Sequence, residues 1–116
     1  MTDVTLYHNP RCSKSRQALA LLEEKGATIH EVRYLDEAPS KADFERLIRQ
    51  LGLARAHDLL RTGEPEYKEA GLSKDSSDKD VIAALVRFPK LLERPIAVVG
   101  DKAVIGRPPE NVLELL

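Results

Sequence analysis

The pattern of the first 34 residues predicts a short strand, a helix and a second strand in close succession. Residues 4–7 are apolar enough for a buried strand, and Asn9-Pro10 is typical of a turn. A helix is expected over 13–25, with Gly26 directly after it. The alternation over 28–34 predicts a second strand, which a crossover helix makes parallel to the first. The chain therefore begins as a βαβ unit of an α/β domain.

Helical patterns occupy the middle of the chain, and a hairpin follows them. The first predicted helix begins with the capping box of Ser40 and Asp43 and stops at Gly52. Two short helices are predicted at 54–60 and 65–70, and a longer one is capped by Ser77 and Asp80. A terminal helix is predicted from Pro108-Pro109 to Leu116. Two apolar runs at 96–99 and 103–105, separated by Gly100-Asp101, predict a β-hairpin. The order is therefore βαβ, helices, ββα.

This order predicts a thioredoxin-like mixed α/β sheet with an inserted helical block at about 40–92. A chain of 116 residues without a linker-like stretch is expected to form a single domain over 1–116. The thioredoxin-like architecture usually places a reactive cysteine between its first strand and first helix, where this chain has Cys12.

The charge balance and the N-terminal sequence exclude several function classes. Eighteen Lys and Arg against 19 Asp and Glu give a net charge of −1, which provides no general attraction to nucleic acid or anionic lipid. No apolar run approaches the roughly 20 residues of a spanning helix. The N-terminal residues also lack the basic-then-apolar order of a signal peptide. We therefore expect no nucleic-acid partner, no membrane partner and a cytoplasmic location.

Cys12 is the only cysteine, which excludes an internal disulfide and a zinc site built on paired cysteines. A lone cysteine is either a small buried apolar residue or a reactive thiol. The second interpretation needs positive potential, because a thiol with a pKa of about 8.5 is only about 3% ionised at pH 7. The expected helix start supplies it through the N–H groups of residues 13–15 and the helix dipole, with the cationic side chains of Arg11, Lys14 and Arg16 nearby.

His8 and Arg16 flank Cys12 at four residues on either side. His8 either helps to keep the thiolate ionised or is a satisfied residue at a strand end. Arg16 either contacts a bound anion or is a solvated charge in the first helical turn. His30 and His57 have no clustered partner in the sequence, so we interpret both as structural and expect no metal site.

Three further arginines have unusual neighbours. Arg94 precedes Pro95 at the expected start of a strand, Arg107 precedes Pro108-Pro109, and Arg61 follows two leucines. The Arg94-Pro95 bond is a candidate cis peptide, and in a thioredoxin-like fold the loop with such a proline faces the cysteine loop. Converging guanidinium groups would bind a tetrahedral oxyanion through bidentate contacts. The sequence leaves open whether the three converge.

Four motifs in this order resemble those of the glutaredoxin-coupled arsenate reductases: YHNPRCSKSR at 7–16, LLR at 59–61, ERPI at 93–96 and GRPP at 106–109. The resemblance covers nearly the whole chain and implies that Cys12 is the catalytic nucleophile. It also implies that His8 and Ser15 keep this thiol ionised. Arg61, Arg94 and Arg107 correspond to the arginines that hold the oxyanion, and Ser13-Lys14 stands where the best-known members have Gly-Thr.

The resemblance implies an oxidoreductase of arsenic detoxification that reduces arsenate to arsenite. The Cys12 thiolate attacks arsenic, glutathione adds to the arsenic, glutaredoxin resolves the mixed adduct and arsenite is released. Glutathione is then a co-substrate, and no tightly bound cofactor is implied. The phosphatase-like arsenate reductases need an arginine six residues after the cysteine, where this chain has Ala18, so that class is excluded.

Two other functions stay open. One is a glutathione-dependent thiol–disulfide reductase, which would use the same activated thiol but has no need of three arginines. The other is an Spx-type redox-linked regulator that binds a protein partner. Spx-type proteins generally carry a C-x-x-C switch, and Ser15 takes the place of its second cysteine. The arginine set therefore favours arsenate.

Overall fold

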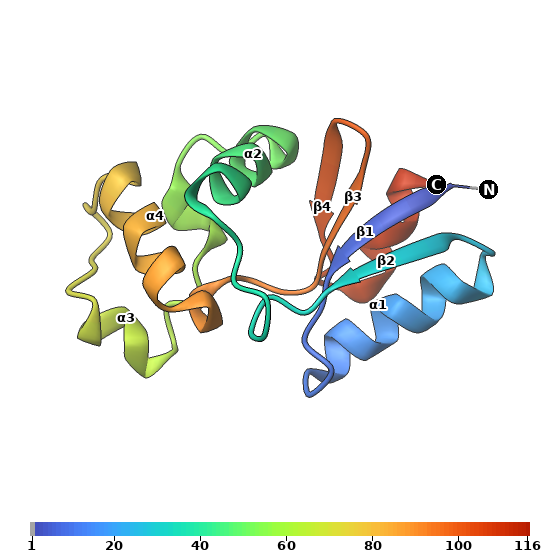
Figure 1. The fold of residues 1–116 in the computed structure, drawn as a ribbon, viewed down its shortest axis with the longest axis horizontal. Helices are drawn as coiled ribbons and strands as arrows, with labels where there is room; N and C mark the ends of the chain where they lie inside the picture. The colour runs from blue at the N-terminus through green and yellow to red at the C-terminus, as the bar shows by residue number, and fades with distance from the viewer. Residues whose placement is uncertain (1) are drawn as a thin grey trace. The chain divides into compact units, whose positions relative to one another are not determined.

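The computed structural model describes residues 2–116, and the chain divides into two compact units (Figure 1). The first unit combines the beginning of the chain up to Glu37 with Arg94–Leu116, and the second is Ala38–Glu93. The second unit therefore corresponds to the helical block expected at about 40–92. That both units form one domain stays a prediction.

The first unit contains a four-stranded mixed sheet with the strand order β2-β1-β3-β4. β1 (Asp3–Tyr7) lies at its centre, parallel to β2 (Thr28–Val32) and antiparallel to β3 (Ile96–Val99). α1 (Ser13–Glu24) is the crossover between β1 and β2, and β3 continues through a tight turn into β4 (Lys102–Ile105). This arrangement confirms the predicted thioredoxin-like βαβ and ββα halves.

The core of this unit anchors β1 and α1. Val4 and Leu6 lie two residues apart in β1, and both are fully buried. Leu22 of α1 and Val112 of η3 (Pro109–Leu115) are fully buried in the same cluster. Burying one such side chain contributes about 1.5–3 kcal/mol. The loop between β1 and α1 is therefore held at both ends by packed elements.

Local sequence sets the ends of the longer helices, as predicted. Gly26 follows α1 with a φ of 77°, a backbone conformation that favours glycine. In the capping box, the Ser40 hydroxyl accepts from Asp43 N–H at 3.2 Å, and the Asp43 carboxylate accepts from Ser40 N–H at 2.9 Å. α2 (Lys41–Leu51) begins there and ends at Gly52 with φ 69°.

The second unit is helical and positions Arg61. Besides α2 it contains η1 (Ala56–Leu59), α3 (Pro65–Glu69), α4 (Asp78–Arg87) and η2 (Pro89–Leu91). Its buried side chains include Phe44, Leu47, Val81 and Leu85. An isolated β-bridge joins Leu60 to Leu92, and Arg61 N–H donates to the Leu91 carbonyl at 2.8 Å. This bridge fixes the backbone at Arg61.

Several predicted elements differ in kind or length. The short segment predicted at 54–60 and the terminal segment are 3₁₀-helices, and the short η2 was not predicted. Pro89 and Pro109 each stand at the first turn of such a segment, where short runs adopt the tighter i to i+3 hydrogen bonds. β2 ends at Val32 instead of residue 34, although Tyr34 is fully buried.

Candidate active site

The loop that carries Cys12 is a tight turn organised by Asn9. Cys12 N–H donates to the Asn9 carbonyl at 2.9 Å, and Arg11 N–H donates to Asn9 Oδ1 at 3.0 Å. Cys12 itself is the N-cap of α1 with an extended backbone, and Arg16 N–H donates to its carbonyl at 3.0 Å. The turn was predicted from the sequence but the role of the Asn9 side chain was not, although an Asn before a turn proline is a signal for it.

The environment of Cys12 favours its thiolate. Burial raises the pKa of the Cys12 thiol, but hydrogen bonds from the Ser15 N–H, the Arg94 guanidinium and the Lys14 N–H outweigh it and lower the pKa below its ordinary value. The N–H groups at the start of the helix therefore lower the pKa of Cys12, as expected. The positive charge that lowers it comes from Arg94, whereas the side chains of Arg11, Lys14 and Arg16 are exposed to solvent.

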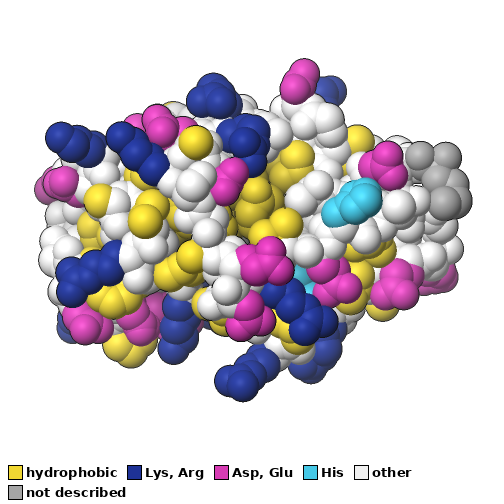
Figure 2. Space-filling model, in the orientation of Figure 1, with side chains coloured by type: hydrophobic (Ala, Val, Ile, Leu, Met, Phe, Trp, Pro, Cys, Tyr) yellow, Lys and Arg dark blue, Asp and Glu magenta, His cyan; other side chains and the backbone are white. Residues whose placement is uncertain are grey.

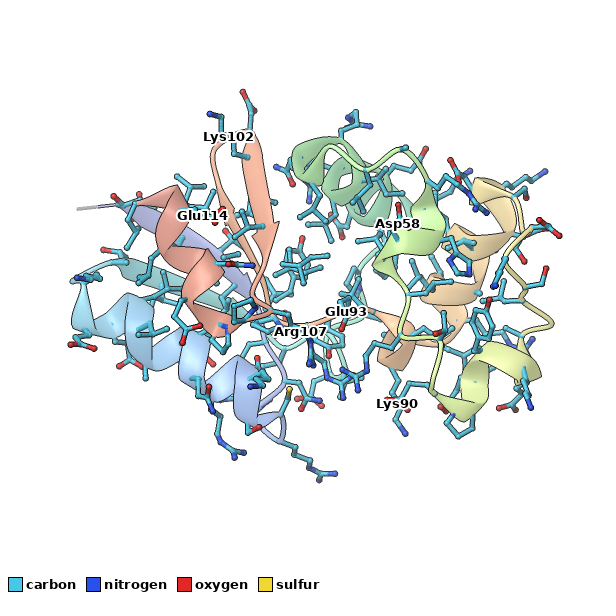
Figure 3. All side chains as sticks on the ribbon, turned by 180° about the vertical axis from the view of Figure 1, so that it is seen from behind. Asp58, Lys90, Glu93, Lys102, Arg107 and Glu114 are labelled. Atoms are coloured by element: carbon cyan, nitrogen blue, oxygen red, sulfur yellow. The ribbon has the colours of Figure 1, made fainter. Side chains whose placement is uncertain are left out.

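Arg94 and Arg107 are far from Cys12 in the sequence, yet both lie beside its sulfur. Nη2 of Arg107 lies 3.8 Å from Cys12 Sγ, and its Nε donates to the Arg94 carbonyl at 2.8 Å. Both arginines precede a cis proline, at Arg94-Pro95, as the sequence suggested, and at Arg107-Pro108. Figure 3 shows Arg107 where the chain leaves β4. Two of the three predicted oxyanion-binding arginines therefore lie beside the thiol.

His8 supports the loop through Ser15. Both side chains are buried, and His8 Nδ1 lies 2.6 Å from Ser15 Oγ, which also accepts from Asn9 N–H at 3.1 Å. Burial lowers the pKa of His8 below its ordinary value, and Arg33 and Arg16 lower it further, while Glu31 opposes the shift. The lowered pKa favours the neutral form of His8, which contacts the loop through its hydrogen bond with Ser15.

The two other predicted arginines have different settings. Arg16 donates from Nη1 to the Pro10 carbonyl at 3.0 Å, which braces the cysteine loop. Arg61 lies in the second unit, where its Nε is 3.3 Å from Glu64 and its Nη1 is 3.6 Å from Glu93. The approach of Arg61 to Cys12 stays a prediction.

Each of the two remaining histidines lies beside one polar side chain. His57 Nε2 lies 2.8 Å from the Tyr67 hydroxyl, and His30 is exposed beside Asp3. Within residues 2–116, no group of three or more His, Cys, Asp or Glu side chains is arranged to hold a metal ion. The same stretch contains no helix with the length and apolar character needed to cross a membrane.

The arrangement at Cys12 suits attack on a small oxyanion. Figure 2 shows Lys and Arg side chains gathered at the lower end of the first unit, where the β1–α1 loop lies. Two guanidinium groups and the first N–H groups of α1 supply donors for anionic oxygens around a partly buried thiolate. Such a site can bind an oxyanion and bring its central atom to the sulfur.

Comparisons with known proteins show what this chain is similar to. The model of the ArsC family matches residues 7–115. An arsenate reductase of Neisseria meningitidis is 44% identical over 117 residues, covering 100% of both chains, and the Escherichia coli protein YfgD is 48% identical over 114 residues, covering 97% of this chain and 96% of its own. The solved arsenate reductase from Vibrio cholerae is 46% identical, superposes with a TM-score of 0.95 and covers 99% of this chain and 98% of its own.

Proposed function

The chain belongs to the ArsC family, and on that premise we propose that it reduces arsenate to arsenite with Cys12 as the nucleophile. The observation that carries this proposal is the pair of guanidinium groups at the thiol. Arg107 Nη2 lies 3.8 Å from Cys12 Sγ, and Arg94 donates a hydrogen bond to the same sulfur. An arsenate anion in contact with both arginines would have its arsenic next to the nucleophile.

The reaction begins with an arsenic adduct on Cys12. The thiolate attacks arsenic, a sulfur–arsenic bond forms and an oxygen leaves as water. The lowered pKa of Cys12 increases the fraction of thiol that is ionised at a given pH. Arg94 and Arg107 compensate the charge on the arsenate oxygens, which allows an anionic nucleophile to approach an anionic substrate.

The two electrons for arsenic come from thiols outside this chain. Since Cys12 is the only cysteine, no second thiol of the protein can close a disulfide with it. Glutathione adds to arsenic and displaces a second water. A glutaredoxin thiolate then attacks the glutathione sulfur, so that a glutaredoxin–glutathione disulfide forms and the bond between that sulfur and arsenic breaks. The electron pair of the broken bond stays on arsenic, which is thereby reduced while bound to Cys12, and water then displaces arsenite and restores the Cys12 thiol.

The supporting residues divide into two roles. His8 and Ser15 position the loop, because their hydrogen bond ties the end of β1 to the first turn of α1. Arg61, paired with Glu64 and Glu93, is proposed as a third arsenate ligand. Arg16 acts on the substrate only indirectly, through its contact with the Pro10 carbonyl.

The test is arsenite production by the purified protein with arsenate, glutathione, glutaredoxin and an NADPH-dependent glutathione reductase. We expect Cys12→Ser to abolish arsenite production and Arg94→Ala or Arg107→Ala to lower kcat/KM about a hundredfold, because each removes a donor to the developing anion. Arg49→Ala, an exposed arginine in the last turn of α2, is the matched control and should retain wild-type kinetics.

Two outcomes would contradict the proposal. Full activity of both arginine variants would exclude an oxyanion held by these guanidinium groups. Absence of arsenite together with rapid alkylation of Cys12 at pH 7 would leave an activated thiol and favour a glutathione-dependent disulfide reductase.

A further inference from the structure

A cavity of about 390 Å³ lies beside the cysteine loop in the first unit. Its lining consists of the loop residues 8–11 together with Arg33, Leu35 and Asp36, which follow β2. Tyr7 and Val32 pair at the carboxyl ends of the parallel strands β1 and β2, so both lining segments leave the sheet at the same edge. Ligands of α/β sheets characteristically bind at this edge.

The lining combines two cations, one anion and an exposed apolar side chain. Arg11 and Arg33 are suited to carboxylates, and Asp36 is suited to an ammonium group. Leu35 is 46% exposed and offers contact to aliphatic groups of a ligand. The cavity therefore matches a small zwitterionic ligand with more than one carboxylate.

The ion pair of Arg33 does not prevent this role. Its Nη2 lies 3.7 Å from Glu31 Oε1, and both side chains are at least one third exposed. Exposed ion pairs of this kind contribute little to the stability of the fold. A guanidinium group also has five N–H donors, so it can serve more than one partner. Arg33 can therefore bind a ligand carboxylate while it stays near Glu31.

We propose that this cavity binds the charged ends of the thiol co-substrate, a γ-glutamyl peptide of the glutathione type, and so brings its thiol to Cys12. The inference rests on the proposed function, which requires such a thiol. Glutathione carries two carboxylates and one ammonium group, which Arg11, Arg33 and Asp36 complement. An extended tripeptide spans about 10 Å, and the lining ends at Arg11, directly before Cys12.

Thiol–disulfide exchange tests this cavity without arsenic. The Cys12 thiolate attacks one sulfur of glutathione disulfide, the sulfur–sulfur bond breaks, a Cys12–glutathione disulfide forms and the second glutathione leaves as its thiolate. Hydroxyethyl disulfide reacts by the same steps but carries no charge. The rate constant for glutathione disulfide divided by that for hydroxyethyl disulfide therefore reports recognition of the charged groups separately from the reactivity of Cys12.

Arg33→Gln should lower this ratio about fivefold, equivalent to about 1 kcal/mol, and added salt should reduce the wild-type ratio because the contacts are exposed. Lys102→Gln removes a cation at the β3–β4 hairpin, away from the cavity, and should leave the ratio unchanged (Figure 3). On the wild-type protein, unreactive S-methylglutathione should shift the backbone amide signals of Asn9, Arg11 and residues 33–36.

The outcomes separate this inference from the proposed function. An unchanged ratio in Arg33→Gln, or amide shifts only elsewhere, would overturn the cavity assignment even if the protein makes arsenite with glutathione. A lowered ratio with matching amide shifts supports the assignment even if no arsenite is made, and in that case the proposed function alone fails.

Discussion

His8 Nδ1 lies 2.6 Å from Ser15 Oγ, and both side chains are buried beneath the cysteine loop. The same hydroxyl oxygen accepts from Asn9 N–H at 3.1 Å, so a single serine joins the end of β1, the turn and the first turn of α1. The conformation of the loop around Cys12 therefore depends on a residue that faces away from solvent.

Ser15→Ala should destabilise the protein by about 1–3 kcal/mol, because it leaves the buried Asn9 N–H and His8 Nδ1 without this partner. Urea unfolding of the variant measures the loss. Ser13→Ala changes an exposed serine of the same helical turn and should cost less than about 0.5 kcal/mol. Equal stability of the two variants would contradict a structural role for Ser15.

The pH dependence of stability should report the buried His8. Because burial lowers the pKa of His8 in the folded protein, the unfolded chain binds more protons once the pH falls below the ordinary histidine value of about 6.5. The stabilising effect of neutral His8 is complete above that pH and is lost as the pH falls toward the folded-state pKa. Urea unfolding between pH 7.5 and pH 5.5 should show a smaller decline for His8→Asn than for the wild type, and parallel declines would refute this explanation.

The thiol of Cys12 should alkylate with a pH midpoint below that of an ordinary cysteine. Arg94→Ala should raise the midpoint, since it removes both a hydrogen bond and a positive charge that lower the pKa of Cys12. Iodoacetamide, which is uncharged, reports the thiolate without an electrostatic contribution of its own. Lys102→Ala is the control, and a midpoint in Arg94→Ala equal to that of the wild type would show that Arg94 does not stabilise the thiolate.

Gly106→Ala should disturb the segment that presents Arg107. A Cβ at Gly106 would lie 2.8 Å from Pro95 Cγ and 3.1 Å from Val112 Cγ1, so we expect a loss of about 1–3 kcal/mol from overpacking. Gly63 has open space around its Cβ position, and Gly63→Ala is the matched control. Thermal unfolding of both variants measures the difference, and wild-type stability of Gly106→Ala would mean that the neighbours move aside at little cost.

Local signals in the sequence predicted most of the secondary structure. The capping box of Ser40 and Asp43, the glycines that end α1 and α2, and the hairpin turn at Gly100 all depend on residues within a few positions of each other. The 3₁₀ character of η1 and η3 was not predictable, because α and 3₁₀ turns share similar residue preferences and differ in how the segment packs.

The candidate site was also predictable only in part, because some of its contacts depend on packing between distant segments. The place of Cys12 at a helix start follows from the strand, turn and helix signals around it, and the resemblance to a family supplied the names of its partners. The charged side chains next to Cys12 in sequence suggested the source of its activation, yet the cationic contribution comes from Arg94. The cavity beside Arg33 has no local signal at all.

The order of the elements, the helix ends and the place of the single cysteine at the start of α1 could be predicted from the sequence, because these features depend on short-range backbone preferences. The neighbours of Cys12 depend on long-range packing, which brings Arg107, 95 residues further along the chain, beside the sulfur and buries His8 with a lowered pKa. Contacts across such separations exist only after β3 pairs with β1 and the core closes, and burial, which sets the pKa of His8, is a property of that packing.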